Sequence, residues 1–181
     1  MLTEFVHFFV TMVKIILIGF MGAGKSTIGA KLSELLGIPF VDTDHEIERL
    51  KGKSIDSIFN DEGEASFRQL ERQMINFLSM IDTEFVLSVG GGLPCFNNLM
   101  LTLKQMGTTV YLKCPTDLLA ERLMHDTQVR PLINGLNKEE VIQFIDQKLL
   151  EREPVYNQAD LIISEEWSAE AILRHLLPRK S

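Results

Sequence analysis

Apolar and polar residues follow two different periods along this chain, and segments of the two kinds alternate. Short runs rich in β-branched and other apolar residues are typical of strands buried on both faces of a sheet. Five such runs are present, at 13–18, 39–41, 85–89, 108–112 and 161–163. Elsewhere apolar residues return every three or four positions, which predicts helices. The predicted helices span 25–36, 44–51, 64–80, 96–106, 116–124, 138–151 and 169–177.

The order of these elements predicts the fold class. Strands that alternate with helices predict an α/β domain with a parallel sheet and helices on both of its faces. Two segments depart from simple alternation. The segment 43–80 carries two or three helices between consecutive strands, and 126–137 is polar and contains Pro131 and Gly135. Excursions of this kind typically hold a substrate and close over it.

Composition limits the kind of ligand that the domain can take. A chain of 181 residues with 45% hydrophobic content can form one domain that buries about 70% of its unfolded surface. Because the net charge is −7, we expect no nucleic-acid partner and a small anionic ligand held by a few local arginines. Cys95 and Cys114 have neither zinc-ligand nor redox-pair spacing, so we expect reduced thiols and a cytoplasmic location.

The first residues are the least typical part of the chain. Phe5–Val10 is apolar enough to resemble the core of a signal peptide, but Glu4 stands where positive charge is expected and no small-residue cleavage site follows. A start of translation at Met12 and an added strand-like or helical extension both stay open. We assign 1–12 as an extension of unknown role and 13–181 as one domain. Since Lys14 interrupts the best apolar run before it reaches about 18 residues, we expect no membrane contact.

The segment Gly19–Ser26 fits the phosphate-loop pattern G-x-x-x-x-G-K-[ST] and lies between a predicted strand and a predicted helix. In such a loop, glycines let successive backbone N–H groups point at phosphate oxygens. Lys25 is then expected to reach the outer phosphates, and the Ser26 hydroxyl to ligate Mg²⁺. A purely structural turn would leave the Lys-Ser pair unexplained.

Two aspartates follow the second predicted strand, at the carboxyl edge of the sheet where open α/β sheets bind ligands. Asp42 is a candidate to hold Mg²⁺ through water, and Asp44 to hydrogen-bond an attacking alcohol. The alternative is helix capping, because Thr43 and Glu46 match a capping box that would leave Asp44 as a first-turn acid.

Three successive glycines, Gly90, Gly91 and Gly92, come directly after the third predicted strand. Residues without Cβ let the backbone touch a ligand closely, so we interpret them as a substrate contact. A structural turn is the alternative.

Three arginines are candidates for holding anions. Arg68 and Arg152 suit a substrate carboxylate, because the planar guanidinium donates two parallel hydrogen bonds. On spacing alone an ordinary structural role is favoured for both arginines, and for Arg68 it would be an exposed pair with Glu71 three residues later. Arg130 stands beside a proline in the polar segment, where a lid arginine can stabilise a transferring phosphoryl group.

From Met12 onward, the chain resembles shikimate kinase. The resemblance covers several motifs that occur in order. These are Gly19–Thr27, Asp42–Asp44, Phe67–Glu71, Gly90–Gly92, Arg130–Ile133 and Arg152–Tyr156. It implies a P-loop fold of the nucleoside-monophosphate-kinase type with a five-stranded parallel sheet, a substrate-binding excursion at about 43–72 and a lid at about 124–137.

The resemblance also implies an activity, the ATP-dependent phosphorylation of the 3-hydroxyl of shikimate. We expect the enzyme to be a monomer. Lys25, Asp44 and Arg130 would be the catalytic residues. The groups that would hold ATP phosphates are Gly22, Ala23, Gly24, Lys25, Ser26, Thr27 and Arg130. By position, shikimate would be bound by Asp44, Arg68, Gly91 and Arg152, and Mg²⁺ by Ser26. From the residue patterns described above, we add Gly90 and Gly92 to the substrate contacts and Asp42 to the magnesium ligands.

Two features depart from the family pattern, and both concern adenine. Members often place an arginine just before the lid for adenine stacking, but here Leu123 matches that position and Arg122 is one residue away. The late loop Ser164–Trp167 contains no basic residue.

Other functions have weaker support. Gluconate kinase would use the same phosphate loop and Asp44, although the two arginines and three glycines favour a different acid. A GTP-dependent switch would need Asn-Lys-x-Asp, and the nearest string, Asn137–Glu140, lacks the aspartate.

Overall fold

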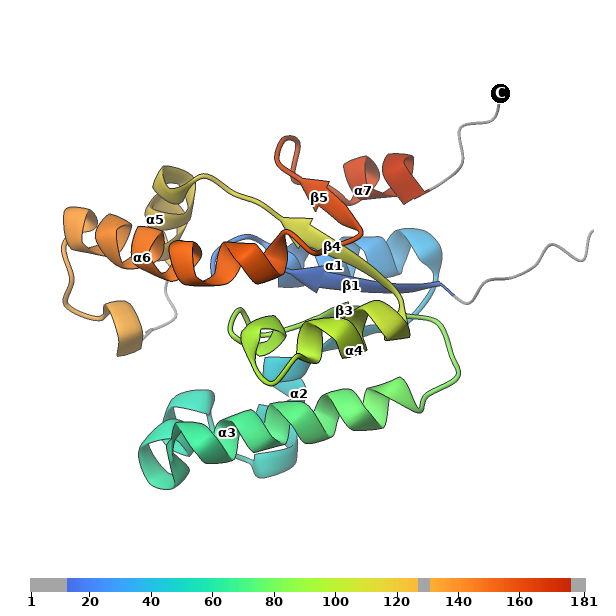
Figure 1. Ribbon diagram of the computed structural model, residues 1–181, viewed down its shortest axis with the longest axis horizontal. Helices are drawn as coiled ribbons and strands as arrows, with labels where there is room; N and C mark the ends of the chain where they lie inside the picture. Colours follow the sequence, from blue (N-terminus) through green and yellow to red (C-terminus); the bar gives the residue numbers. More distant parts are fainter. Residues whose placement is uncertain (1–12, 127–130, 177–181) are drawn as a thin grey trace, which may run out of the picture.

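The computed structural model describes residues 13–126 and 131–176. Within this part of the chain, all strands join one parallel sheet (Figure 1) in the order β2-β3-β1-β4-β5. The strands are β1 (Lys14–Ile18), β2 (Phe40–Asp42), β3 (Phe85–Ser88), β4 (Thr108–Leu112) and β5 (Leu161–Ile163). The predicted five-stranded parallel sheet is therefore confirmed, with strand ends that differ from the prediction by one residue at most.

Helices connect the strands in the predicted order. They are α1 (Lys25–Leu36), α2 (Thr43–Lys51), α3 (Ile55–Ser79), α4 (Leu99–Met106), α5 (Thr116–His125), α6 (Lys138–Tyr156) and α7 (Ala169–Leu176), with 3₁₀ turns η1 (Leu93–Cys95) and η2 (Pro131–Ile133). In the described ranges, none of these helices is long and apolar enough to cross a membrane.

The core explains why β1 is apolar at nearly every position. Ile15 and Leu17 pack on one side of the sheet in a cluster with α1, α5, α6 and α7. Ile16 and Ile18 pack on the other side with α3 and α4. All four side chains are at most 1% exposed. Helices cover both faces of the sheet, as predicted (Figure 1).

Helix α3 bends at a glycine in its first half. Gly63 has φ +80° and ψ 166°, which is not helical and which L-residues with a side chain rarely adopt. The part after the bend corresponds to the predicted helix 64–80, and the preceding turns from Ile55 belong to the predicted excursion. The part after the bend carries Arg68, whose guanidinium lies beside Gly92.

Helix α6 runs to Tyr156, beyond the predicted end at Glu151 and past Pro154. A proline normally ends a helix, because it lacks an N–H for the carbonyl four residues earlier. Here that earlier residue, Leu150, is 80% exposed, whereas Tyr156 is completely buried. Packing of the tyrosine keeps the last turn helical, so Arg152 lies on a helix.

Only the flanks of the predicted lid are described. Its downstream side is anchored, since Ile133 packs into the core cluster that contains α5 and α6. Asn137 then begins α6 in a capping box with Glu140. Arg130 and the extension 1–12 lie outside the described residues, so the lid and the extension stay predictions.

Candidate functional site

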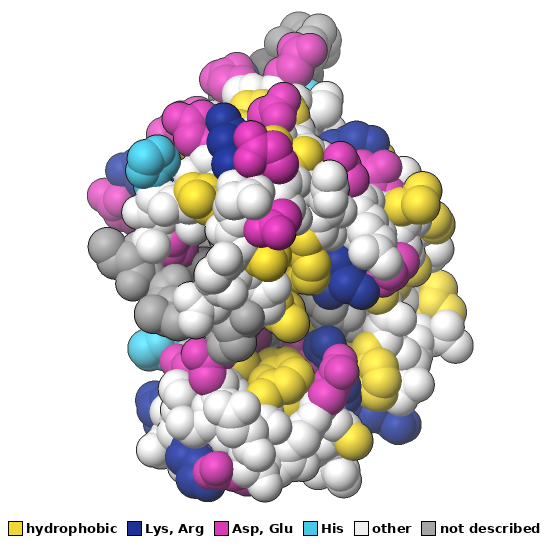
Figure 2. Space-filling view, turned by 90° about the vertical axis from the view of Figure 1, so that its left-hand side faces the viewer, with side chains coloured by type: hydrophobic (Ala, Val, Ile, Leu, Met, Phe, Trp, Pro, Cys, Tyr) yellow, Lys and Arg dark blue, Asp and Glu magenta, His cyan; other side chains and the backbone are white. Residues whose placement is uncertain are grey.

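The predicted site residues gather at the carboxyl end of the sheet, where the chain leaves β1, β2 and β3. Figure 2 shows that this end of the molecule is hollowed between α6 above and α3 below, with basic and acidic side chains around the hollow. The loop after β1, the start of α2, the glycines after β3, and residues of α3 and α6 contribute to it.

The loop after β1 has the geometry of an anion cradle. Gly22 and Gly24 have φ +81° and +90°, a left-handed conformation that favours glycine. Gly24 precedes α1 without a side-chain cap, so the first N–H groups of the helix remain directed at a ligand. Lys25 Nζ donates to the carbonyls of Gly19 and Phe20, at 3.0 Å each, which folds the lysine back over the loop. The loop fits phosphate groups.

A hydroxyl and a carboxylate meet beside this loop. Ser26 Oγ donates to Asp42 Oδ2 at 2.7 Å. Asp42 Oδ1 accepts from the backbone N–H groups of Asp44 (3.1 Å) and His45 (3.4 Å), so Asp42 caps α2. The capping box that would use Thr43 as the cap is therefore wrong, because the cap is the aspartate before it.

The oxygens of Ser26 and Asp42 suit Mg²⁺, a hard cation that prefers oxygen ligands. Among the described residues, no group of three or more His, Cys, Asp or Glu side chains could hold a metal ion. A cation bound here would complete its shell with phosphate oxygens and water, as Mg²⁺ does at nucleotide sites. The donor set thus fits magnesium accompanied by a nucleotide.

Asp44 lies in the first turn of α2, in surroundings that favour a proton acceptor. Burial raises the pKa of its carboxyl, and the nearby Asp42 carboxylate raises it further, while the Lys25 ammonium opposes both. A raised pKa makes a carboxylate a stronger base when it is ionised. The environment of Asp44 therefore suits the predicted role of aligning a hydroxyl and accepting its proton.

The three glycines after β3, called here the glycine row (Gly90–Gly92), give space to site side chains. A Cβ on Gly90 would lie 2.9 Å from both Asp44 Oδ1 and Glu71 Oε1. A Cβ on Gly92 would lie 2.9 Å from two Arg68 nitrogens. Both distances are shorter than real Cβ atoms make, so any larger residue would displace these groups.

The middle glycine touches the phosphate loop. A Cβ on Gly91 would lie 3.3 Å from the carbonyl oxygen of Gly19 and 3.5 Å from Arg152 Nη1. Two acids (Asp44 and Glu71), two arginines (Arg68 and Arg152) and the phosphate loop therefore converge at the glycine row. The turn-only interpretation of these glycines does not account for this crowding.

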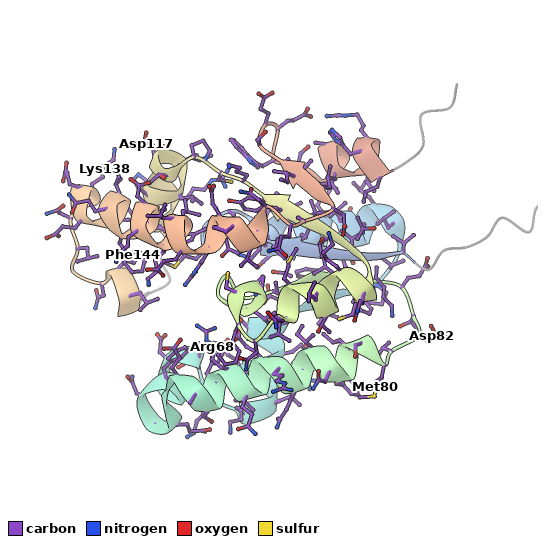
Figure 3. All side chains as sticks on the ribbon, in the orientation of Figure 1. Arg68, Met80, Asp82, Asp117, Lys138 and Phe144 are labelled. Carbon is purple, nitrogen blue, oxygen red and sulfur yellow. The ribbon has the colours of Figure 1, made fainter. Side chains whose placement is uncertain are left out.

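Arg68 is held between two carboxylates. Nη1 donates to Glu71 Oε2 at 2.8 Å, and Nη2 to Glu64 Oε1 at 2.9 Å. The arginine side chain is 16% exposed and that of Glu71 only 1%, so the ordinary exposed pair is excluded. Figure 3 shows Arg68 projecting from α3 toward the glycine row.

Glu71 has an unusual titration. Burial raises the pKa of its carboxyl to about 7, and the hydrogen bond and charge of Arg68 only partly oppose this. The strength of the ion pair that holds Arg68 therefore changes near neutral pH.

Arg152 approaches the glycine row from α6. Its guanidinium carbon lies 5.5 Å from the centroid of the Phe20 ring, a cation–π distance. Phe20 belongs to the phosphate loop, and its side chain is 1% exposed. The charges of both Arg152 and Arg68 lower the pKa of the Cys95 thiol, against the larger effect of burial, which raises it.

Sequence reasoning missed the role of Arg122. Its Nη1 donates to the Gly22 carbonyl at 3.1 Å, so this arginine reaches the phosphate loop although it is one residue from the family position. Leu123, at that position, is 5% exposed and fills the space beside Gly22. The helical spacing of Leu119 and Leu123 could have indicated that both face inward, with Arg122 beside them.

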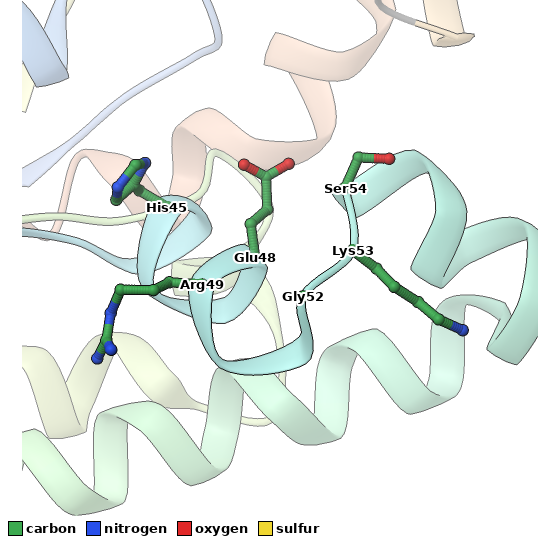
Figure 4. A pocket seen from close by; sticks show the side chains of 6 residues that line it. All are labelled: His45, Glu48, Arg49, Gly52, Lys53 and Ser54. Carbon is green, nitrogen blue, oxygen red and sulfur yellow. The ribbon is translucent and has the colours of Figure 1, made fainter.

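An open pocket of about 430 Å³ lies between the end of α2 and the start of α3 (Figure 4). It is lined by His45, Glu48, Arg49, Gly52, Lys53 and Ser54, none of which is a predicted site residue. Its two permanent cations already pair with Glu46 and Asp61. We assign the reaction to the glycine row rather than to this pocket, because the phosphate loop, Asp44 and the two arginines converge there.

Comparison with known proteins identifies the family. Residues 21–179 match the sequence model of the family described as Shikimate kinase. The chain belongs to the shikimate kinase family. A shikimate kinase of Azobacteroides pseudotrichonymphae is 41% identical over 167 residues, which cover 92% of this chain and 98% of that protein.

Solved structures of shikimate kinases have the same fold. The crystal structure of the Bacteroides thetaiotaomicron enzyme has a TM-score of 0.83 at 39% identity and covers 91% of this chain and 96% of that one. The Acinetobacter baumannii enzyme, solved in complex with shikimate, also has a TM-score of 0.83 at 39% identity, covering 95% and 97%. A Sinorhizobium meliloti gluconokinase shares the fold at 18% identity and a TM-score of 0.52, covering 91% and 89%.

Proposed function

We propose that this protein transfers the γ-phosphoryl group of ATP to the 3-hydroxyl of shikimate. The observation that carries the proposal is the convergence at the glycine row, where an anion cradle, a buried carboxylate and two arginines meet. Membership of the shikimate kinase family and the likeness to an enzyme solved with shikimate support the choice of acceptor.

The chain's own residues divide the task. Arg68 and Arg152 would hold the carboxylate of the acceptor beside the glycine row. Asp44 would then align the hydroxyl and accept its proton as the bond to phosphorus forms. Lys25 would neutralise charge on the transferring group in an in-line displacement.

Ser26 and Asp42 would hold Mg²⁺, which when bound neutralises charge on the nucleotide phosphates. Gly22, Ala23, Gly24 and Thr27 would complete the phosphate cradle. Arg130 would enter with the lid and act on the same charge, so Arg130→Ala should lower kcat more than it changes shikimate affinity. We further propose a cytoplasmic, monomeric enzyme, and sedimentation velocity at micromolar concentration tests the monomer.

An acceptor comparison tests the proposal. ADP release should be fast with shikimate and close to the no-acceptor rate with gluconate, each measured with ATP and Mg²⁺. Phosphorus–proton coupling in the product should place the phosphate on the 3-oxygen. Fast turnover of gluconate, or a product phosphorylated elsewhere, would contradict it.

The role of Asp44 has its own test. Asp44→Asn should lower kcat by about 100-fold or more while shikimate binding, measured by calorimetry, stays within a few fold. Glu46→Gln, on the same helix and paired only at the surface with Arg49, is the matched control.

A further inference from the structure

Tyr156 is a buried polar side chain to which the reaction assigns no role. It ends α6 and is completely buried. Its hydroxyl donates a hydrogen bond to the carbonyl of Gly91, the middle residue of the glycine row. Burial raises the pKa of this hydroxyl to about 12, so it keeps its proton and remains a donor throughout the physiological range.

The same hydroxyl lies beside an acid-binding arginine. Arg152 stands one helical turn earlier on α6, and its positive charge and hydrogen bonding lower the pKa of the Tyr156 hydroxyl against the larger effect of burial. Gly91 in turn packs against the phosphate loop, because the position that a Cβ would take on this residue faces the Gly19 carbonyl. A single hydroxyl thus joins the helix that carries Arg152 to the backbone against which Arg152 must bind a substrate.

We propose that Tyr156 is a positioning residue, which fixes the distance between Arg152 and the glycine row and thereby sets the affinity for the acceptor's carboxylate. Tyr156 itself does not contact the substrate. Without the hydroxyl, the end of α6 would be tied to the glycine row by ring packing alone, and the Gly91 carbonyl would lose its buried donor. This inference rests on the proposed function, since it needs an acid as acceptor.

The chain offers a matched control in Tyr111. Its ring lies 5.0 Å from that of Tyr156, between centroids, and is 1% exposed. Its hydroxyl donates to Glu153 Oε1 at 3.4 Å, so it bonds to α6 but not to the glycine row. Each hydroxyl thus makes a partly buried hydrogen bond in the same cluster, and of the two only that of Tyr156 bonds to the glycine row.

The test compares Tyr156→Phe and Tyr111→Phe in the full chain. Tyr156→Phe should raise the KM for shikimate by about three- to tenfold, the effect of one hydrogen bond, with kcat and the KM for ATP within about twofold. Tyr111→Phe should leave all three within about twofold. With shikimate methyl ester, which lacks the negative charge, Tyr156→Phe should change KM by less than about twofold, so the preference for acid over ester falls.

Three outcomes would overturn the inference that Tyr156 positions Arg152. An unchanged KM for shikimate in folded Tyr156→Phe, an equal rise for acid and ester, or the same rise in Tyr111→Phe overturns the inference. Circular dichroism checks folding, and if Tyr156→Phe does not fold, 3-fluorotyrosine at position 156 replaces it. That residue keeps the shape with a stronger donor, so a weaker preference for acid over ester would overturn the inference. A wild type that does not phosphorylate shikimate would instead refute the proposed function.

Discussion

Asp42 accepts a hydrogen bond from the Ser26 hydroxyl with one carboxylate oxygen and caps α2 with the other. One side chain thereby connects the start of α1 with the end of β2 and the start of α2, where the predicted substrate-binding excursion begins. In the proposed function the charge of Asp42 would matter for the metal ion, whereas capping of α2 needs only an oxygen acceptor.

Asp42→Asn should separate the two purposes. The amide oxygen can still cap α2, so unfolding by urea should change little, but the Mg²⁺ concentration for half-maximal activity should rise by about tenfold. Asp42→Ala should lose stability as well. The control is Asp117→Asn, an exposed acid in the first turn of α5. An unaltered magnesium dependence in Asp42→Asn would show that the metal binds elsewhere.

Lys25→Ala should lower kcat by about 1,000-fold or more, because it would remove the charge that we propose neutralises the phosphates. The fold should persist, since the two loop carbonyls that accept from Lys25 are polar groups that water can reach once the side chain is removed. Lys31→Ala removes an exposed lysine from the same helix, paired with Glu34, and should keep full activity. Turnover and far-ultraviolet circular dichroism check both variants, and normal turnover in Lys25→Ala would refute the phosphate-loop assignment.

Arg68→Ala and Arg152→Ala should each raise the KM for shikimate by about 10- to 100-fold, with a much smaller effect on the KM for ATP. Arg68→Lys should not restore affinity, because lysine lacks the planar fork. Arg72→Ala removes an exposed arginine from the same helix as Arg68 and should match the wild type. Equal losses for shikimate and ATP would mean that the site is divided differently.

The raised pKa of Glu71 predicts that the free energy of unfolding depends on pH. Its folded-state pKa of about 7 lies above the ordinary value of 4.5, so the folded protein holds this proton more strongly than the unfolded chain. Protonation of Glu71 therefore stabilises the folded state. This stabilisation is complete below pH 4.5 and is lost as the pH rises through 7. Between pH 5.5 and 8, the free energy of unfolding of the wild type should fall by about 2 kcal/mol relative to Glu71→Gln.

Urea unfolding at several pH values measures that difference. The control is Glu64→Gln, which removes the other partner of Arg68, a carboxylate that is 66% exposed, and which should parallel the wild type across the range. If Glu71→Gln also parallels the wild type, Glu71 does not titrate near neutral pH.

The sequence predicted the elements better than the contacts. Helix α1 begins and ends at the predicted residues, because a phosphate loop precedes it and Gly37 follows it with φ +68°. The end of α6 was mispredicted, because the helix past Pro154 depends on the burial of Tyr156. Rules that use only neighbouring residues cannot predict a helix end that depends on packing against distant parts of the chain.

The glycine row shows the same limit at the site. Its position after a strand predicted close contact, but the atoms that crowd it come from α2, α3, α6 and the phosphate loop. Periodicity predicts which face of a helix is buried, not which atom of another element it meets. The burial of the Arg68–Glu71 pair was therefore visible only once α3 had been placed against the sheet.

The strand order determines when during synthesis the site can assemble. Strand β1 is made first, yet its neighbours are β3 and β4, with Lys14 beside Phe85 and Ile15 beside Thr108. Until β3 leaves the ribosome, β1 has no neighbour in the sheet, and the phosphate loop has no glycine row to pack against. Pairings between strands far apart in sequence slow folding, because the entropy cost of closing the intervening loop comes before the stabilising contacts form. The nascent chain therefore carries the apolar strand β1 unpaired through the synthesis of α1, β2, α2 and α3, a period in which it is exposed to aggregation and to chaperones.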